Sequence, residues 1–247
     1  MSKANKDNVK TCILDWVLSN WKYSYQDSSQ VLKELSRIWG AQNCLGFVLS
    51  EEMGPTDPLS VLSLEAQADI ESSILLAISG FYRHATLVLR SWLALGYASV
   101  WFSFNFTGFN LWMKRDANAP FRYRGVMNSH LLQELMSKTE HLKKASKAFN
   151  LVKNGMRLHL ELSDFVHSRG REALDIYQRD DSVPHYYSER LRSWFDRFRQ
   201  VFEIWVILIF ARYPQLLKTV RHPQEKEQVL SALSNETRAR FQSLSKD

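Results

Sequence analysis

Apolar side chains recur at every third or fourth residue through most of the chain, which is the spacing of one face of an α-helix. This pattern predicts helices over about 9–17, 31–39, 60–105, 131–147, 156–168 and 187–217, with a short charged helix after residue 235. Asp27-Ser28-Ser29 is expected to supply the N-cap of the second helix. No stretch alternates apolar and polar residues for long enough to predict a strand. The predicted fold is therefore all-α, a helical bundle built on long antiparallel helices.

Two interruptions of this pattern suggest how the chain is organised. The run from Met53 to Pro58 contains a glycine and two prolines, which cannot continue a helix, so it predicts a loop. Ser79-Gly80 lies inside the long apolar stretch and predicts that this stretch folds back into two antiparallel helices. We therefore expect N-terminal helices over 1–58 packed on a helical bundle over 59–220, followed by a short charged helical tail over 221–247.

Composition narrows the class of protein. Nine glycines and six prolines among 247 residues are few, which argues against sandwiches and barrels rich in tight turns. Cys12 and Cys44 cannot form a zinc site alone, and free thiols are typical of a reducing compartment. The polar first ten residues do not resemble a secretory signal. The apolar runs Trp92–Phe106 and Val201–Phe210 are shorter than the roughly 18 to 20 residues of a membrane span. The sequence thus predicts a cytoplasmic protein without a membrane partner.

The net charge of +6 is unevenly distributed. Residues 111–171 carry twelve basic and five acidic side chains, a net charge of +7, which is suited to a polyanion such as RNA. A solvated helix face is the alternative explanation. The candidate nucleic-acid-binding residues are Arg122, Arg124, Lys143, Lys144, Arg157 and Arg171. The late helix adds a second basic face, opposite its apolar residues, formed by Arg190, Arg192, Arg197 and Arg199.

The helix predicted over 156–168 carries a polar stripe next to its apolar face. His159, Ser163 and His167 are spaced by four residues, so they follow one side of the helix. The two histidines are two turns apart, roughly 12 Å, and cannot chelate one metal ion. His167 beside Arg169 has the residue types needed for acid–base cleavage of a phosphodiester. A structural role is the alternative, because an imidazole near a helix C-terminus interacts well with the last carbonyls.

Arg90 is the other unusual residue, because apolar side chains surround its helix on nearly all sides. A guanidinium in such a helix requires an acceptor, because burying it unpaired is very costly. Motifs for phosphate-binding loops, dinucleotides, zinc and nucleophilic serine are absent. We therefore predict no metal and no cofactor, with His167, Arg90 and Arg169 as the candidate catalytic residues.

Two segments carry a resemblance to a known family. These are Ser79-Gly-Phe-Tyr-Arg-His-Ala-Thr-Leu-Val-Leu-Arg90-Ser-Trp-Leu and Leu162-Ser-Asp-Phe-Val-His167-Ser-Arg. Together with the Pro120-Phe121 loop and the late aromatic helix, they resemble bacterial proteins of the HEPN class (higher eukaryotes and prokaryotes nucleotide-binding) over roughly residues 60–215. The resemblance implies a bundle with two long antiparallel helices that often dimerises, so that polar residues of both subunits meet in a cleft.

The resemblance also implies two alternative functions. Many HEPN proteins are metal-independent ribonucleases of toxin–antitoxin, CRISPR or phage-defence systems, whereas others are non-catalytic modules that bind protein or nucleic acid within such complexes. The catalytic members carry an arginine four to six residues before the histidine. Glu161, Leu162 and Ser163 occupy those positions here. The arginine would therefore have to come from Arg90, from Arg169 or from a partner subunit.

Overall fold

The computed structural model describes residues 15, 17–121, 125–166, 185–218 and 222–244. These residues form helices and connecting turns, without a strand among them, which confirms the predicted all-α fold. Residues 17–27 are helical. The helices that follow are α2 (Ser29–Met53), α3 (Pro58–Ile78), α4 (Tyr82–Phe102), α5 (Phe106–Met113), α6 (Ser129–Ser137), α7 (Glu140–Phe149), α8 (Leu151–Val166), α10 (Ser188–Arg212), α11 (Gln215–Lys218), α12 (Pro223–Ala232) and α13 (Asn235–Leu244).

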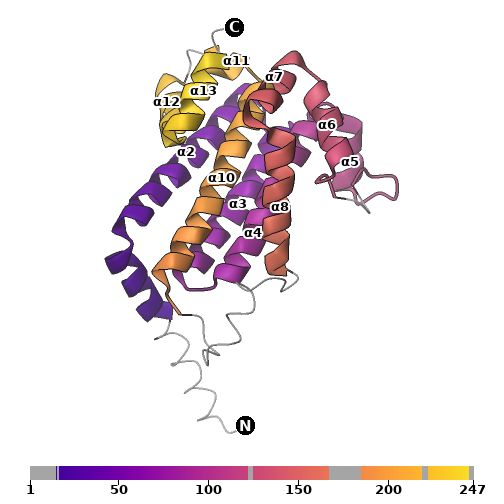
Figure 1. Cartoon of the computed structure of the whole chain (residues 1–247). Helices are drawn as coiled ribbons and strands as arrows, with labels where there is room; N and C mark the ends of the chain where they lie inside the picture. The colour runs from indigo at the N-terminus through magenta and orange to yellow at the C-terminus, as the bar shows by residue number, and fades with distance from the viewer. Residues whose placement is uncertain (1–14, 16, 122–124, 167–184, 219–221, 245–247) are drawn as a thin grey trace.

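The long helices α2, α3, α4, α8 and α10 run side by side along the bundle, and the shorter helices gather towards one end (Figure 1). The hairpin of α3 and α4 lies at its centre, because α4 also packs against α8 and α10. As predicted, the hairpin turns at Ser79-Gly80, where Gly80 adopts a φ of 85°, in the left-handed region that favours glycine. Inside the hairpin, the Ser73 hydroxyl donates to the Ala85 carbonyl at 2.8 Å.

Glycines bring two helices close to α4. A Cβ atom at Gly96 would lie 2.7 Å from Cε3 of the buried Trp205, so glycine is what allows α10 to pack this closely. Gly155 of α8 similarly receives the ring of Tyr97. The Tyr97 hydroxyl donates to the Leu151 carbonyl at 2.8 Å, which satisfies a polar group in a fully buried side chain. These contacts fix the position of α8 along α4.

The helix ends differ from the sequence prediction in two places. Ser28 occupies the N-cap position of α2 but makes no side-chain capping bond, because its hydroxyl is hydrogen-bonded to the Tyr186 hydroxyl at 2.6 Å. The stretch 131–147 is not one helix but two, α6 and α7. Thr139 separates them by capping α7, its hydroxyl accepting from the Leu142 amide at 3.2 Å.

The C-terminal part of the chain also differs. The late helix ends at Arg212 instead of continuing to residue 217, since Pro214 cannot donate the next helical hydrogen bond. The helical tail predicted over 221–247 contains two helices, α12 and α13, and α12 packs along α2. Glu203 explains how α13 is attached to α10. Its carboxylate accepts from the Ser234 amide at 2.8 Å and from the Thr237 hydroxyl at 2.7 Å, at the start of α13.

None of the described helices is both long enough and apolar enough to cross a lipid bilayer. The hydrophobic core runs from Val31 in α2 to Phe241 in α13, and its largest fully buried side chains include Trp92, Trp194 and Trp205.

Candidate functional site

Arg90 lies on α4 at its contact with α8. The two helices are antiparallel, because Tyr97 contacts the first turn of α8 and the Arg83 Nε donates to the Phe165 carbonyl in its last turn at 2.9 Å. Arg90 lies midway between these contacts and is half-buried. Its Nε is buried and has no hydrogen-bond partner in the described part of the chain. A buried N–H donor without an acceptor is costly. Because Arg90 as a whole is only half-buried, the rest of its guanidinium is suited to an anionic ligand.

His159 of α8 is the titratable group next to Arg90. Burial lowers the pKa of the imidazole below its ordinary value of 6.5, and the positive charge of Arg90 lowers it further. Its Nδ1 is buried and, among the residues described, has no hydrogen-bond partner. A depressed pKa keeps the ring neutral near pH 7, in the form that can accept a proton. Arg90 and His159 therefore place a cation and a neutral imidazole together on facing helices.

The polar stripe continues towards the C-terminal end of α8. Ser163 lies one turn beyond His159, but its hydroxyl donates to the His159 carbonyl at 2.6 Å and is used within the helix. Two arginines hold the last turn. Arg83 binds the Phe165 carbonyl, and the guanidinium carbon of Arg197 lies 5.0 Å from the centroid of the Phe165 ring. Positive charge thus gathers beside the point where α8 ends at Val166, immediately before His167 in the sequence.

His159 was predicted on the polar stripe of its helix, but neither it nor Arg83 nor Arg197 was predicted to lie near Arg90. Arg83 could have been found, because it precedes Arg90 by seven residues, which is two helical turns on the same side of α4. Arg197 and His159 could not be assigned in this way. Their roles depend on which helices pack together, and helical spacing does not contain that information.

Five of the candidate residues lie outside the described part of the structure. They are His167, Arg169, Arg171, Arg122 and Arg124. Their assignments as catalytic or nucleic-acid-binding residues therefore stay predictions from sequence.

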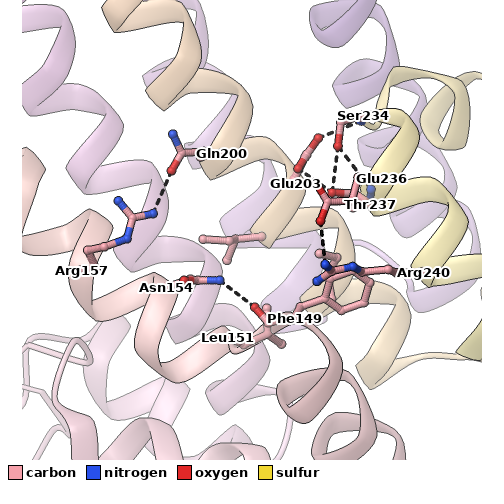
Figure 2. A pocket seen from close by; sticks show the side chains of 12 residues that line it. Phe149, Leu151, Asn154, Arg157, Gln200, Glu203, Ser234, Glu236, Thr237 and Arg240 are labelled. Carbon is pink, nitrogen blue, oxygen red and sulfur yellow. Dashed lines mark hydrogen bonds and ion pairs between the residues drawn. The ribbon is translucent and has the colours of Figure 1, made fainter.

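The remaining basic candidates lie on α7 and α8. Lys143 and Lys144 are both exposed on α7, and the Lys143 ammonium lies 3.8 Å from the Glu140 carboxylate. Arg157 of α8 forms an ion pair with Glu161 and donates to the Gln200 side chain at 3.1 Å. Arg157 also lines a pocket between α8, α10 and α13 (Figure 2).

The predicted basic face of the late helix is wrong for three of its four arginines. Arg190 packs over the Tyr187 ring, with its guanidinium carbon 4.8 Å from the ring centroid. Arg197 packs over Phe165, and Arg199 forms an ion pair with Glu34 of α2. Only Arg192, among these four, is exposed. These three arginines therefore form two cation–π contacts and one ion pair within the protein.

In the described part of the chain, no three histidine, cysteine, aspartate or glutamate side chains gather closely enough to hold a metal ion. Comparison of the chain with protein-family models, with curated proteins and with solved structures found no match. The arrangement of Arg90 and His159 on α4 and α8, and the residues at the end of α8, are thus the basis for assigning a function.

Proposed function

We propose that this chain is a HEPN-like ribonuclease of a bacterial defence or toxin system, which cleaves RNA without a metal ion. One observation carries the proposal: the charge of Arg90 on α4 acts on His159 of α8, and each residue has a buried nitrogen that lacks a partner in the described structure. A phosphodiester would accept hydrogen bonds from the half-buried Arg90 guanidinium. The positive charge of Arg83 and Arg197 near the end of α8 supports the same substrate.

The proposed reaction uses His167 as the acid–base residue and Arg90 or Arg169 as the phosphate ligand. The imidazole accepts the proton of the ribose 2′-hydroxyl while the 2′-oxygen forms a bond to phosphorus. The bond from phosphorus to the 5′-oxygen breaks, and that oxygen takes up a proton from water. The imidazolium then returns its proton to the solvent. The products are a 2′,3′-cyclic phosphate and a 5′-hydroxyl end. The guanidinium stabilises the charge that develops on the phosphorane oxygens.

A homodimer forms part of this proposal. Leu64 and Leu75 lie on one side of α3, three turns apart, and their exposed fractions are 72% and 51%. Large apolar side chains this exposed are suited to a protein interface. A second copy of the chain would cover them.

The test is degradation of labelled single-stranded RNA and tRNA, in buffer with excess EDTA, by the wild type and by His167→Ala. We expect the wild type to produce fragments with 5′-hydroxyl ends, and His167→Ala to lose at least about 100-fold of the rate, as is typical for removal of an acid–base residue. Circular dichroism of both proteins establishes that the variant is folded. Intact RNA at high wild-type concentration contradicts the catalytic proposal.

The alternative is a non-catalytic module that binds nucleic acid as a subunit of a defence complex. The exposure of Lys143 and Lys144 on α7 favours it. Under this alternative, RNA binds without being cleaved, and its affinity decreases steeply with salt. Reversing both charges, Lys143→Glu with Lys144→Glu, then weakens RNA binding, whereas His167→Ala leaves it unchanged.

A further inference from the structure

A pocket of about 220 Å³ lies between α8, α10 and the start of α13. Among the candidate residues that the structure describes, only Arg157 lines it. Its apolar side is formed by Phe149, Leu151, Ile204 and Ile207. Polar side chains surround the opening. Figure 2 shows Arg157 and Gln200 on one side, and Glu203, Thr237 and Arg240 on the other. An apolar wall with a few oriented polar groups is the usual construction of a small-molecule site.

The charges that line the pocket are balanced. Two are positive, on Arg157 and Arg240, and two are negative, on Glu203 and Glu236. The two arginines also form ion pairs, Arg157 with Glu161 and Arg240 with Glu236. Because the pocket has no net excess of positive charge, it is poorly suited to a phosphate or another small anion. It favours a neutral ligand that carries both donors and acceptors.

The order of the polar groups along α10 further restricts the class of ligand that fits the pocket. Gln200, which accepts from Arg157 Nη2 at 3.1 Å, and Glu203 are three residues apart, a rise of about 4.5 Å on one side of a helix. The Arg157 guanidinium, bound to Gln200, and the Glu203 carboxylate therefore line the same pocket from positions about one turn apart along α10. Glu203 already accepts from Ser234 and Thr237, one bond to each oxygen. Each oxygen of an ionised carboxylate retains a further lone pair.

We propose that this pocket binds an unstacked guanine base. Guanine is neutral and planar, and it presents two N–H donor groups, N1–H and the 2-amino group, beside two acceptors, O6 and N7. The donors match the Glu203 carboxylate, and the acceptors match the Arg157 guanidinium, which is the usual partner of guanine O6 and N7. The apolar wall, which includes the Phe149 ring, covers the face of the base. Adenine lacks both the N1–H donor and the O6 acceptor.

In the proposed ribonuclease, this pocket would select one base of the substrate. The assignment of guanine rests on the pocket alone, whereas its place in an RNA substrate rests on the proposed function. Arg157 and His159 are two residues apart on α8 and point to different sides of the helix. RNA held between α4 and α8 would therefore need to pass around α8 to place a base in the pocket. Cleavage at a fixed distance from a guanine would follow.

The test is calorimetric titration of the full-length His167→Ala protein with uncharged nucleosides, so that neither cleavage nor phosphate contacts contribute. We expect guanosine to bind roughly tenfold or more tightly than adenosine, cytidine or uridine, as for other bidentate base contacts. Inosine, which lacks the 2-amino group, should bind more weakly than guanosine. A zwitterionic amino acid is the other ligand suited to balanced charges, and tighter binding of L-glutamine than of guanosine overturns the proposal.

Two variants assign the roles of the pocket residues. Glu203→Gln is expected to abolish the preference for guanosine over inosine, and Arg157→Met to weaken the binding of both by about tenfold. Arg192→Met is the matched control, because Arg192 is an exposed arginine of α10 that does not line the pocket. Equal binding of guanosine to all three variants contradicts the site. Because the titration involves no RNA cleavage, guanosine binding without ribonuclease activity would reject the proposed function and leave the pocket assignment intact.

Discussion

His159 lies where burial and a neighbouring guanidinium act on its charge in the same direction. Both disfavour the imidazolium, and burial is the larger effect. In Arg90→Gln, the pKa of His159 should therefore rise towards its ordinary value of 6.5 while staying below it, because burial remains. Histidine NMR titration measures this change, with Arg192→Gln as the control. An unchanged pKa in Arg90→Gln would show that the two residues do not interact in solution.

The same pKa has a consequence for stability. Well above pH 6.5, His159 is neutral in both the folded and the unfolded chain, so its contribution to the free energy of unfolding is fully present. As the pH decreases from 6.5 towards the lower folded pKa, the unfolded chain takes up a proton first, and the free energy of unfolding decreases. Below the folded pKa this loss levels off. Denaturant titrations at several pH values measure the free energy of unfolding of the wild type and of His159→Gln. We expect the difference between these two free energies to change with pH across this range. Parallel curves would contradict it.

Site residues could be predicted where the local sequence alone marks them, and not where helix packing decides their neighbours. Arg90 could be singled out because a cation in an apolar helix conflicts with the cost of burying charge. Its neighbour could not be predicted, since His159 is contributed by a distant helix and only the packing of α8 on α4 brings them together. Arg197 was expected on an exposed face, and Phe165 holds it instead.

At the level of elements, close packing between α4 and α10 depends on Gly96. In Gly96→Ala, the new methyl group would meet Trp205, which is 1% exposed and has little room to move. Overpacking of this kind costs about 1–3 kcal/mol, partly offset by the better helix propensity of alanine. Gly46→Ala is the matched control, because a Cβ atom there meets nothing within 4 Å. It should stabilise the protein by about 0.5–1 kcal/mol. Thermal unfolding distinguishes the two, and equal effects would show that the α4–α10 contact is looser than described.

The elements themselves were largely predictable, and their ends were less so. The turn at Ser79-Gly80 could be predicted because glycine tolerates the left-handed backbone found there. The break at Thr139 was missed, because apolar spacing continues across it while the threonine caps α7. Ser28 was expected to cap α2, but a hydroxyl has several available partners, and here it binds Tyr186.

For the whole molecule, the exposed leucines of α3 lead to a prediction about assembly. The wild type should have twice the mass of one chain in solution, measured by light scattering coupled to size-exclusion chromatography. Leu64→Glu with Leu75→Glu should yield monomers, since charged side chains are costly in an apolar interface. Lys143→Glu is a surface control that should remain dimeric. A monomeric wild type at high concentration would remove the dimer from the proposal.

The distribution of charge was predictable only in outline. The excess of basic residues in 111–171 is visible in the sequence, whereas the distance between Lys143 on α7 and Arg90 on α4 depends on the fold. The structure separates them onto different helices. A catalytic role for Arg90 and a binding role for Lys143 can therefore be tested by separate variants in different helices.

The most direct test of the proposed function is the single-turnover rate of RNA cleavage by Arg90→Gln, compared with Arg192→Gln at the same salt concentration. Both variants lose one positive charge, but only Arg90 lies between α4 and α8 with a buried Nε that lacks a partner among the described residues. The proposal predicts that Arg90→Gln slows cleavage about 100-fold or more, as for loss of a group that stabilises transition-state charge, while Arg192→Gln stays close to the wild type. Equal rates for the two variants would contradict the proposed site.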